Sequence, residues 1–414
     1  MEMKKLLTKT GTKEKNEQKR TFAPPPHYEK EWLAAGLTKE ENIYGIVYKK
    51  VIYYDLNHQH GDIILSNLQS AIELWRNSGE SHPLAPDFTK PLVFFDTETT
   101  GLKGAGTLIF LLGFIEQTEN AFKLTQYILP GPDHEPAFLY ASQLWKHKLT
   151  LVTYNGKSFD VPQLETRWAM NRNLVPALLS HAHIDLLHGS RRIWKAEIEA
   201  FNLTTIEEEK LGFFRKEDIP GYMAPIIYQD AVKSGNANLL MKVLTHNEWD
   251  ILSLVALYIR ATELVLEEDL RGTALAHTNI GKWFADLKSY DRGRRIFESV
   301  ITEYGASHPV THFHFGFIMK RNEDYSGAIT SFKIAAKGLT GRQRIIALEE
   351  LAKLYEHKIK KLEKALEVTK EGRCFLQEDP DLTTRFRERG QVNFRKRENR
   401  IFRKLFPGQA QKST

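Results

Sequence analysis

The stretch Pro91-Leu-Val-Phe-Phe-Asp96-Thr-Glu98-Thr-Thr100-Gly101 contains the pattern that decides the fold. Its run of apolar and aromatic residues predicts a buried strand, with two carboxylates at the strand exit. Side chains two positions apart in a strand lie on the same face, so Asp96 and Glu98 should point together. Neighbouring anions repel each other unless a divalent cation neutralises them. The stretch therefore predicts a metal-dependent site at the end of a central strand.

Strand and helix signals alternate around this stretch. The predicted strands cover residues 92–95, 108–115, 122–129, 150–154 and 183–186, and the predicted helices cover residues 137–146 and 160–171. This order is typical of a mixed sheet with helices on its faces. We therefore expect an α/β domain over residues 90–262.

The segments before this domain differ from it in character. Residues 1–26 are polar and rich in lysine and end in three prolines, which predicts a disordered basic arm. Residues 27–89 form a flanking segment, in which residues 43–54 alternate like a strand or hairpin and residues 68–75 have a helical pattern.

A repeated pattern follows the α/β domain. Each unit has a large residue, a small residue three positions later and a bulky residue four positions beyond that. The units are Tyr290, Gly293 and Phe297, then Tyr325, Ala328 and Phe332, and more weakly Leu362, Ala365 and Thr369. This spacing is typical of tetratricopeptide-like helical hairpins, which stack into a solenoid. We expect an all-α repeat domain over residues 268–378, with a generic helical bundle as the alternative.

The C-terminal tail, residues 379–414, is strongly basic. From Asp381 onward it has ten Lys or Arg residues against three acidic ones, whereas the net charge of the whole chain is +6. Four phenylalanines (386, 394, 402 and 406) are interleaved with these cations. Cations and aromatic rings suit a nucleic acid. The alternative is a solvated basic helix whose phenylalanines dock on the preceding domain.

The composition favours a cytoplasmic globular protein. The chain has 414 residues, of which 42% are hydrophobic, and no apolar run approaches the roughly 18 residues of a membrane span. Its N-terminus lacks the apolar core of a secretory signal. The single cysteine, Cys374, excludes an intrachain disulfide and a Cys-rich zinc site.

Two further motifs can complete the site at the strand exit. In Thr153-Tyr-Asn155-Gly156-Lys-Ser-Phe-Asp160 the chain leaves a strand and enters a helix. Asp160 in the first helical turn can bind metal or complement the helix dipole, and Asn155 can bind substrate or cap the turn. His246 and Asp250 share one face of a predicted helix, where they can activate a water or form a surface pair.

The order Asp-x-Glu, Asn…Asp, His-x-x-x-Asp resembles that of the DEDD superfamily (DnaQ-like, RNase H-like) of 3′–5′ exonucleases, and within it the YprB-like family. The resemblance implies two Mg²⁺ or Mn²⁺ ions, an attacking water handled by His246, and a nucleic-acid substrate with a single-stranded 3′ end. The implied metal ligands are Asp96, Glu98, Asp160 and Asp250, and the implied substrate-binding residues are Thr99 and Asn155.

One feature departs from the superfamily. Its last motif is either Tyr-x-x-x-Asp or His-x-x-x-x-Asp, whereas His246 combines the histidine with the shorter spacing. One residue rotates a helical side chain by about 100°, so the role of His246 as general base stays open.

The expected reaction is metal-dependent hydrolysis of phosphodiester bonds in DNA or RNA, because carboxylates bind hard divalent cations that activate water. An endonuclease would use the same ligands. A catalytically silent nucleic-acid-binding or scaffolding protein, with the repeats recruiting a protein partner, is the alternative from another class. The glycines between Gly101 and Gly106 do not follow the order of a dinucleotide-binding loop, which argues against a Rossmann domain.

Overall fold

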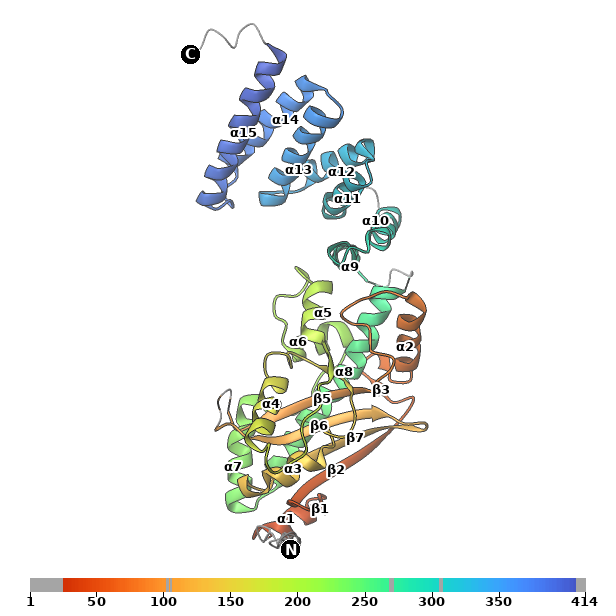
Figure 1. Cartoon of the computed structure of the whole chain (residues 1–414), viewed down its shortest axis with the longest axis vertical. Coiled ribbons are helices and arrows are strands. Elements are labelled where there is room, and N and C mark those ends of the chain that lie inside the picture. The colour runs from red at the N-terminus through yellow and green to blue at the C-terminus, as the bar shows by residue number, and fades with distance from the viewer. Residues whose placement is uncertain (1–24, 102–103, 105, 268–271, 305–307, 407–414) are drawn as a thin grey trace, which may run out of the picture.

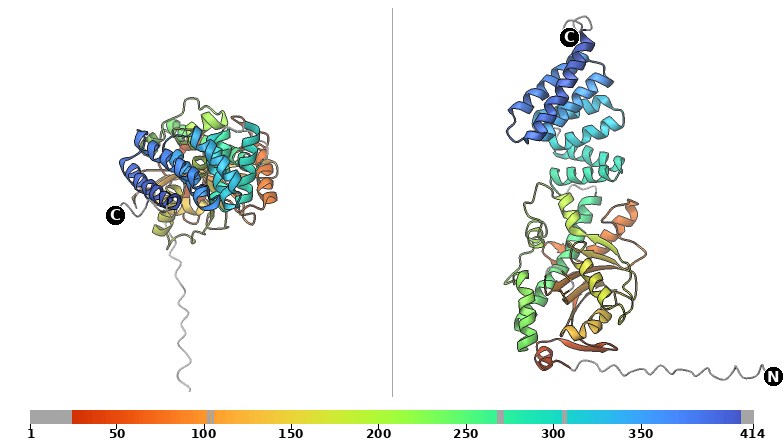
Figure 2. Two further views of the ribbon diagram at one scale, coloured as in Figure 1. Left: turned by 90° about the horizontal axis from the view of Figure 1, so that it is seen from above. Right: turned by 60° about the vertical axis from the view of Figure 1, so that its left-hand side comes forward.

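The computed structural model describes residues 25–101, 104, 106–267, 272–304 and 308–406. It is elongated: the part that contains the sheet and the helices from residue 274 onward follow one another along the long axis (Figures 1 and 2). The expected disordered arm, residues 1–26, lies almost entirely outside the described residues, as do residues 407–414 of the tail.

A mixed seven-stranded sheet forms the centre of the first part, and it confirms the predicted α/β class. The strand order is β1-β2-β7-β6-β5-β8-β9. Strands β1 to β7 of this sheet pair antiparallel, whereas β8 and β9 extend it from β5 in parallel. The strands are β1 (Thr38–Asn42), β2 (Gly45–Asp55), β5 (Leu92–Thr99), β6 (Ile109–Gln117), β7 (Ala121–Ile128), β8 (Thr150–Thr153) and β9 (Ala182–Asp185); β3 (Gln59–His60) and β4 (Ile63–Ile64) form a separate pair.

Helices cover the sheet and connect its strands. They are α1 (Glu29–Ala34), α2 (Asn67–Ser78), α3 (Glu135–Ala141), α4 (Asp160–Met170), α5 (Leu186–Ile193), α6 (Leu203–Ile206), α7 (Ala224–Ser234) and α8 (Asn238–Leu266). Short 3₁₀ turns cover Pro132–His134 and Gly221–Met223, and a π-helical turn covers Glu207–Leu211.

The long helix α8 positions the site because it packs against the centre of the sheet. Phe94 of β5 lies in one buried apolar cluster with the C-terminal half of α8, and its ring is 5.8 Å from that of Tyr258. Val93 and Phe95 point the other way, into a second buried cluster. Gly113 of β6 allows α8 to approach the sheet closely, because a Cβ at this position would lie 2.5 Å from the side chain of Ile251. Residues of β5 in phase with Phe94 therefore face α8.

Two segments differ from the sequence-based boundaries. The helix predicted over residues 137–146 ends at Ala141, because the backbone of Gln143 leaves the helical region with a φ of 56°. The indole nitrogen of Trp145 then donates to the carbonyl of Tyr140. Residues 43–54, read as a strand or a hairpin, contain a single strand, because Gly45–Asp55 form β2 and its hairpin partner β1 lies before the turn at Ile43 and Tyr44.

The second part is helical, as predicted. It contains α9 (Ala274–Asp286), α10 (Tyr290–Tyr304), α11 (Pro309–Arg321), α12 (Tyr325–Gly338), α13 (Gly341–Lys353) with a π-helical turn Leu354–Lys358, α14 (Leu362–Glu378) and α15 (Thr384–Leu405). The first residue of each repeated unit, Tyr290, Tyr325 and Leu362, begins a helix. Gly281 of α9 packs on Phe297 of α10, just as Gly316 of α11 packs on Phe332 of α12. The same contact therefore recurs within two successive helix pairs.

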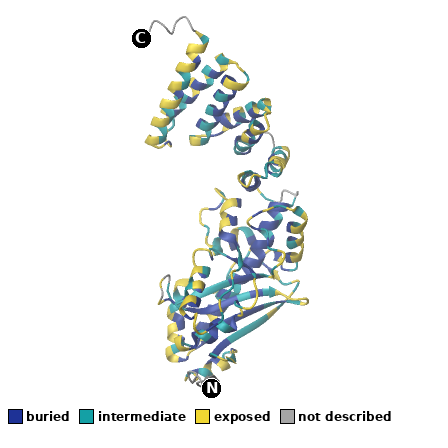
Figure 3. Ribbon diagram, in the orientation of Figure 1, coloured by how far each residue is buried: buried dark blue, intermediate teal, exposed yellow. Residues whose placement is uncertain are grey.

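The basic tail forms helix α15, which packs on α14. Much of its outer face is exposed (Figure 3). Phe394 and Ile401 are buried, whereas Phe402 and Phe406 are exposed. Only some of the interleaved phenylalanines therefore dock on the preceding helices. Among the described residues, no helix combines the length and the apolar character needed to cross a membrane.

Candidate metal centre

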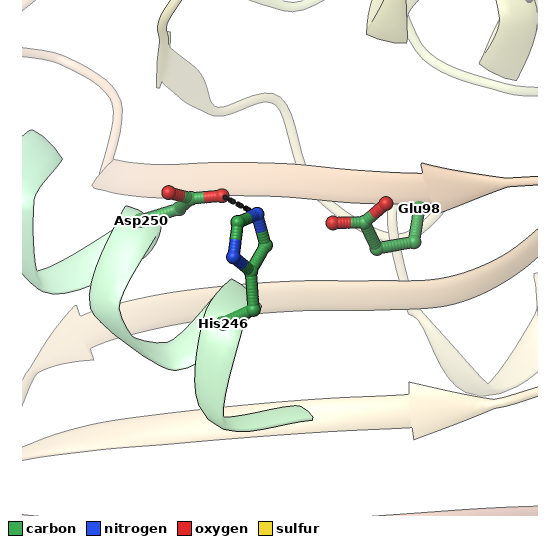
Figure 4. Close-up of side chains that lie close together, drawn as sticks. All are labelled: Glu98, His246 and Asp250. Carbon is green, nitrogen blue, oxygen red and sulfur yellow. Dashed lines mark ion pairs between the residues drawn. The ribbon is translucent and has the colours of Figure 1, made fainter. Parts of the chain in front are cut away.

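Strand β5 and helix α8 bring the first and last motifs together. Glu98 points from β5 toward His246 and Asp250, which lie one turn apart on α8 (Figure 4). One ligand atom from each of the three lies within 4.8 Å of the other two. His246 Nε2 is 3.4 Å from Asp250 Oδ2. We refer to Asp96, Glu98, Asp160 and Asp250 as the acidic group. Despite its shorter spacing to Asp250, His246 therefore faces carboxylates of this group.

Asp160, in the first turn of α4, is not one of the three residues within 4.8 Å of one another but lies close enough for its charge to act on Asp96 and Glu98. Its Oδ1 accepts a hydrogen bond of 2.5 Å from Thr97 Oγ1 of β5. Asp96 and Glu98 retain partial solvent exposure but have protein atoms on most sides. The charges of Asp160 and Asp250 repel the carboxylates of both Asp96 and Glu98.

The electrostatics of the group favour a cation. Burial, followed by repulsion from Asp250 and Asp160, raises the pKa of both Asp96 and Glu98 well above their usual values. Burial also raises the pKa of Asp160 to about 6, against the hydrogen bond from Thr97. Carboxylate oxygens with one imidazole form a donor set that binds divalent cations. The residues present therefore fit a divalent metal ion.

Asn247 orients Asp96, a contact that the sequence motifs did not indicate. Its Nδ2 donates to Asp96 Oδ2 at 2.8 Å, and its Oδ1 accepts from Gln126 Nε2 at 2.8 Å. Asn247 is fully buried. A Cβ on Gly113 would lie 2.1 Å from Asn247 Oδ1, so this glycine makes room for the amide. Asn247 adjoins His246 in sequence, but no local pattern marks it.

A buried ionic network lies behind Asp250 and His246. Arg215, with a side chain only 4% exposed, pairs with Asp250 and with Glu207, whose side chain is fully buried. Its Nη1 also donates to Asp218 Oδ2 at 3.0 Å. Ser253 Oγ donates to Glu207 Oε1, and lies 2.8 Å from the ring nitrogen Nε2 of His60.

The charged groups of this network shift one another's pKa values. Burial acts to raise the pKa of Asp218, but hydrogen bonds from His246 and Arg215 outweigh it and lower that pKa. Burial raises the pKa of Glu207 despite its bonds with Arg215. Arg215, Asp218 and Glu207 lie in a segment without a periodic pattern, so the sequence carried no signal for their roles.

The two candidate substrate residues have local structural roles of their own. Thr99 Oγ1 donates to the carbonyl of Gly101 at 2.7 Å, where β5 has a bulge. Asn155 has φ of 63° and donates its backbone N–H to Asp185 Oδ1. Asp185 also caps α5 by accepting from the N–H of Leu187, and its Oδ2 accepts from that of Lys157. It thereby holds the turn that leads to Asp160.

Comparisons with known proteins agree with this geometry. The family model for the RNase H superfamily matches residues 93–262, which include every residue of the acidic group. Such a domain points to a nucleic-acid hydrolase and usually uses divalent metal ions. The chain is also 38% identical over 366 residues to the uncharacterized protein YprB of Bacillus subtilis (strain 168), over 87% of this chain and 88% of YprB. The chain therefore belongs to the RNase H-like family that includes YprB.

Proposed function

We propose that this protein is a metal-dependent 3′–5′ exonuclease of the DEDD type. The observation that carries the proposal is the convergence of Glu98, His246 and Asp250 within 4.8 Å, in a superfamily domain, beside Asp96 and Asp160. A group of buried like charges raises the free energy of the fold unless it binds a cation. Its position at the centre of the sheet is therefore best explained by a catalytic metal site.

Each residue of the site has a chemical role in this proposal. Asp96, Glu98, Asp160 and Asp250 would hold two Mg²⁺ or Mn²⁺ ions. Bound ions of this kind lower the pKa of a coordinated water and neutralise charge on the scissile phosphate. The imidazole of His246 would take the proton of the attacking water at Nε2. Thr99 and Asn155 would contact the nucleotide at the 3′ end.

Helix α15 offers a second contact for nucleic acid. The residues Arg385, Arg389, Lys396 and Arg403 recur at spacings of four and seven, so they share one face, and all four are exposed. By contrast, Arg397, Arg400 and Lys404 bond to the buried Glu356. The first set is thus available for phosphates, while the second fixes the helix.

The remaining segments have supporting roles in the proposal. Residues 90–262 would carry the catalytic residues, and residues 27–89, expected as a flanking segment, supply β1 and β2 of the same sheet. Residues 268–378 would be a tetratricopeptide-like array, in agreement with the recurring Gly281–Phe297 and Gly316–Phe332 contacts. Such an array suits recruitment of a protein partner.

The test is a gel assay of purified protein with single-stranded DNA and RNA labelled at either end, in Mg²⁺, Mn²⁺ or EDTA. We expect metal-dependent shortening from the 3′ end with mononucleotide products, no activity for Asp96→Ala, and normal activity for the exposed control Glu119→Ala. Internal fragments would indicate an endonuclease. Intact substrate in all lanes, with a shift on a native gel, would instead support a silent binding protein.

A further inference from the structure

Asp218 contacts the ring nitrogen of His246 that points away from the acidic group. His246 Nδ1 lies 2.8 Å from Asp218 Oδ1 and 2.9 Å from Oδ2. Asp218 belongs to the loop between the π-helical turn and the 3₁₀ turn, and reaches α8 across the fold. An ionised carboxylate only accepts hydrogen bonds. The proton of a neutral His246 ring must then be on Nδ1.

The neighbouring Arg215 supports this assignment. Its Nη1 lies 3.2 Å from the same Nδ1 and 3.0 Å from Asp218 Oδ2. A lone pair on Nδ1 would accept from Arg215, but it would also face the Asp218 carboxylate at 2.8 Å without a proton between them. With the proton on Nδ1, Asp218 accepts from both His246 and Arg215, and no two acceptors meet on the Nδ1 side of the ring. On the other side, the Nε2 lone pair faces Asp250, an arrangement that a metal ion or a water between the two atoms would satisfy.

The consequence concerns the other ring nitrogen. With Nδ1 protonated, Nε2 carries a lone pair, and this atom lies 3.4 Å from Asp250 Oδ2 and close to Glu98. A proton acceptor for water, or a ligand atom for a metal ion, needs that lone pair on Nε2. The opposite tautomer would present an N–H there and could do neither.

Arg215 fixes Asp218 relative to the acidic group. Its Nη2 donates to Asp250 Oδ1 and, at 2.6 Å, to Glu207 Oε1, while its Nε donates to Glu207 Oε2 at 2.7 Å. The guanidinium is planar and rigid, so these bonds set its orientation. One cation thereby ties Asp218 and Asp250 in one frame, with His246 between them.

We propose that Asp218, braced by Arg215, is a positioning residue that holds His246 with Nδ1 protonated and the Nε2 lone pair facing Glu98 and Asp250. The catalytic use of that lone pair rests on the proposed nuclease function, whereas the tautomer itself does not. The side chain of Asp218 forms its hydrogen bonds with His246, Arg215 and the N–H of Ile219, and none of these is a candidate metal ligand of β5. We therefore assign its effect on the site to the orientation of His246.

The tautomer can be measured in metal-free protein without substrate. Two-bond ¹H–¹⁵N correlation spectra of ¹⁵N-histidine-labelled protein at about pH 8.5 distinguish protonated from unprotonated ring nitrogens, and His246→Gln identifies the signals of His246. We expect a protonated Nδ1 and an unprotonated Nε2. In Asp218→Asn the amide can donate to Nδ1, so we expect a substantial shift to the opposite tautomer. The exposed neighbour Glu217 provides a control, Glu217→Gln, that should leave the spectrum unchanged.

Kinetics provide the second readout. Because the Asn side chain fills the same space, Asp218→Asn should lower kcat about 10- to 100-fold while KM changes little, as is typical of residues that orient a metal-site histidine. Thermal denaturation of each variant would show whether it folds.

The outcomes separate the two proposals. An unprotonated Nδ1 or a doubly protonated ring in the wild-type protein would overturn the positioning role, and so would an unchanged tautomer and kcat in Asp218→Asn. Should the wild-type protein have the expected tautomer but hydrolyse no nucleic acid, the positioning role would stand and the nuclease proposal would fail.

Discussion

The side-chain nitrogen Nδ2 of Asn247 lies 2.8 Å from Oδ2 of Asp96, and this bond joins α8 to β5 at the acidic group. Asn247 is held in turn by Gln126 of β7, whose Nε2 also donates to the carbonyl of Leu244 at 2.7 Å. The carboxylate of Asp96 is therefore oriented by a chain of buried amides that spans three elements. A side chain fixed in this way is preorganised for metal binding.

Asn247→Ala removes the donor to Asp96 and the acceptor of Gln126. Because a buried polar group loses its partner, we expect a loss of about 1–3 kcal/mol in the free energy of unfolding. Urea denaturation in EDTA measures this loss. Asn393, exposed on α15, supplies the control Asn393→Ala. Equal urea midpoints for Asn247→Ala and wild type would show that the amide chain does not stabilise the fold.

The raised pKa of Asp160 predicts a pH-dependent stability of the metal-free protein. Its folded-state pKa of about 6 exceeds the ordinary aspartate value of 3.8. The folded state then binds the proton more tightly, so this contribution is complete below about pH 4 and is lost as the pH rises through 6. The difference corresponds to about 3 kcal/mol.

Asp160→Asn isolates this effect, because the amide has no such proton. In EDTA, the stability of wild type relative to Asp160→Asn should fall between pH 4.5 and pH 7, and Mg²⁺ at pH 7 should restore it for wild type alone. Thermal denaturation curves at both pH values provide the comparison. A difference between the two proteins that stays constant with pH would mean that Asp160 does not titrate as described.

Arg215→Met should destabilise the protein strongly. It leaves the fully buried Glu207 carboxylate without its cation, and breaking a buried ion pair from one side costs about 3–5 kcal/mol. The double variant Arg215→Met/Glu207→Gln removes both charges and should recover much of this loss. Chemical denaturation of wild type and both variants tests the coupling; additive effects of the two substitutions would contradict it.

Charge reversal on the outer face of α15 should affect long substrates only. Lys396→Glu/Arg403→Glu removes cations that have no ion-pair partner among the described residues, at the end of the molecule away from the sheet (Figure 1). We expect weaker binding and a smaller salt dependence for oligonucleotides long enough to reach α15, and unchanged hydrolysis of short ones. Lys30→Glu/Lys233→Glu is the matched control, since both lysines are exposed. Equal losses on short and long oligonucleotides would exclude a remote contact.

The sequence predicted β5 to β9 of the sheet because these strands are short apolar runs with clear ends, but it did not place β1 and β2 of the preceding segment in the same sheet. It predicted the length of α3 poorly, since the apolar pattern continues through Leu144 and Trp145, which are turn residues that pack without being helical. The first and last motifs could be placed because their spacing puts side chains on one face. Asp218, Arg215 and Asn247 could not be identified, because their roles depend on contacts between elements far apart in the chain.

The short spacing of His246 shows a second limit. From the helix geometry alone its direction relative to the carboxylates was uncertain, and only the position of α8 against β5 decides it. That position depends in turn on Gly113, where a larger side chain would collide with Asn247 and Ile251.

Calorimetric titration of Mn²⁺ into the metal-free protein at pH 7 tests the central claim, a metal centre formed by the β5, α4 and α8 carboxylates, most directly. We predict saturable binding by the wild-type protein, its loss in Glu98→Gln/Asp250→Asn, and its retention in the control Glu119→Ala. The same binding in wild type and in Glu98→Gln/Asp250→Asn, or no binding in either, would contradict the metal centre.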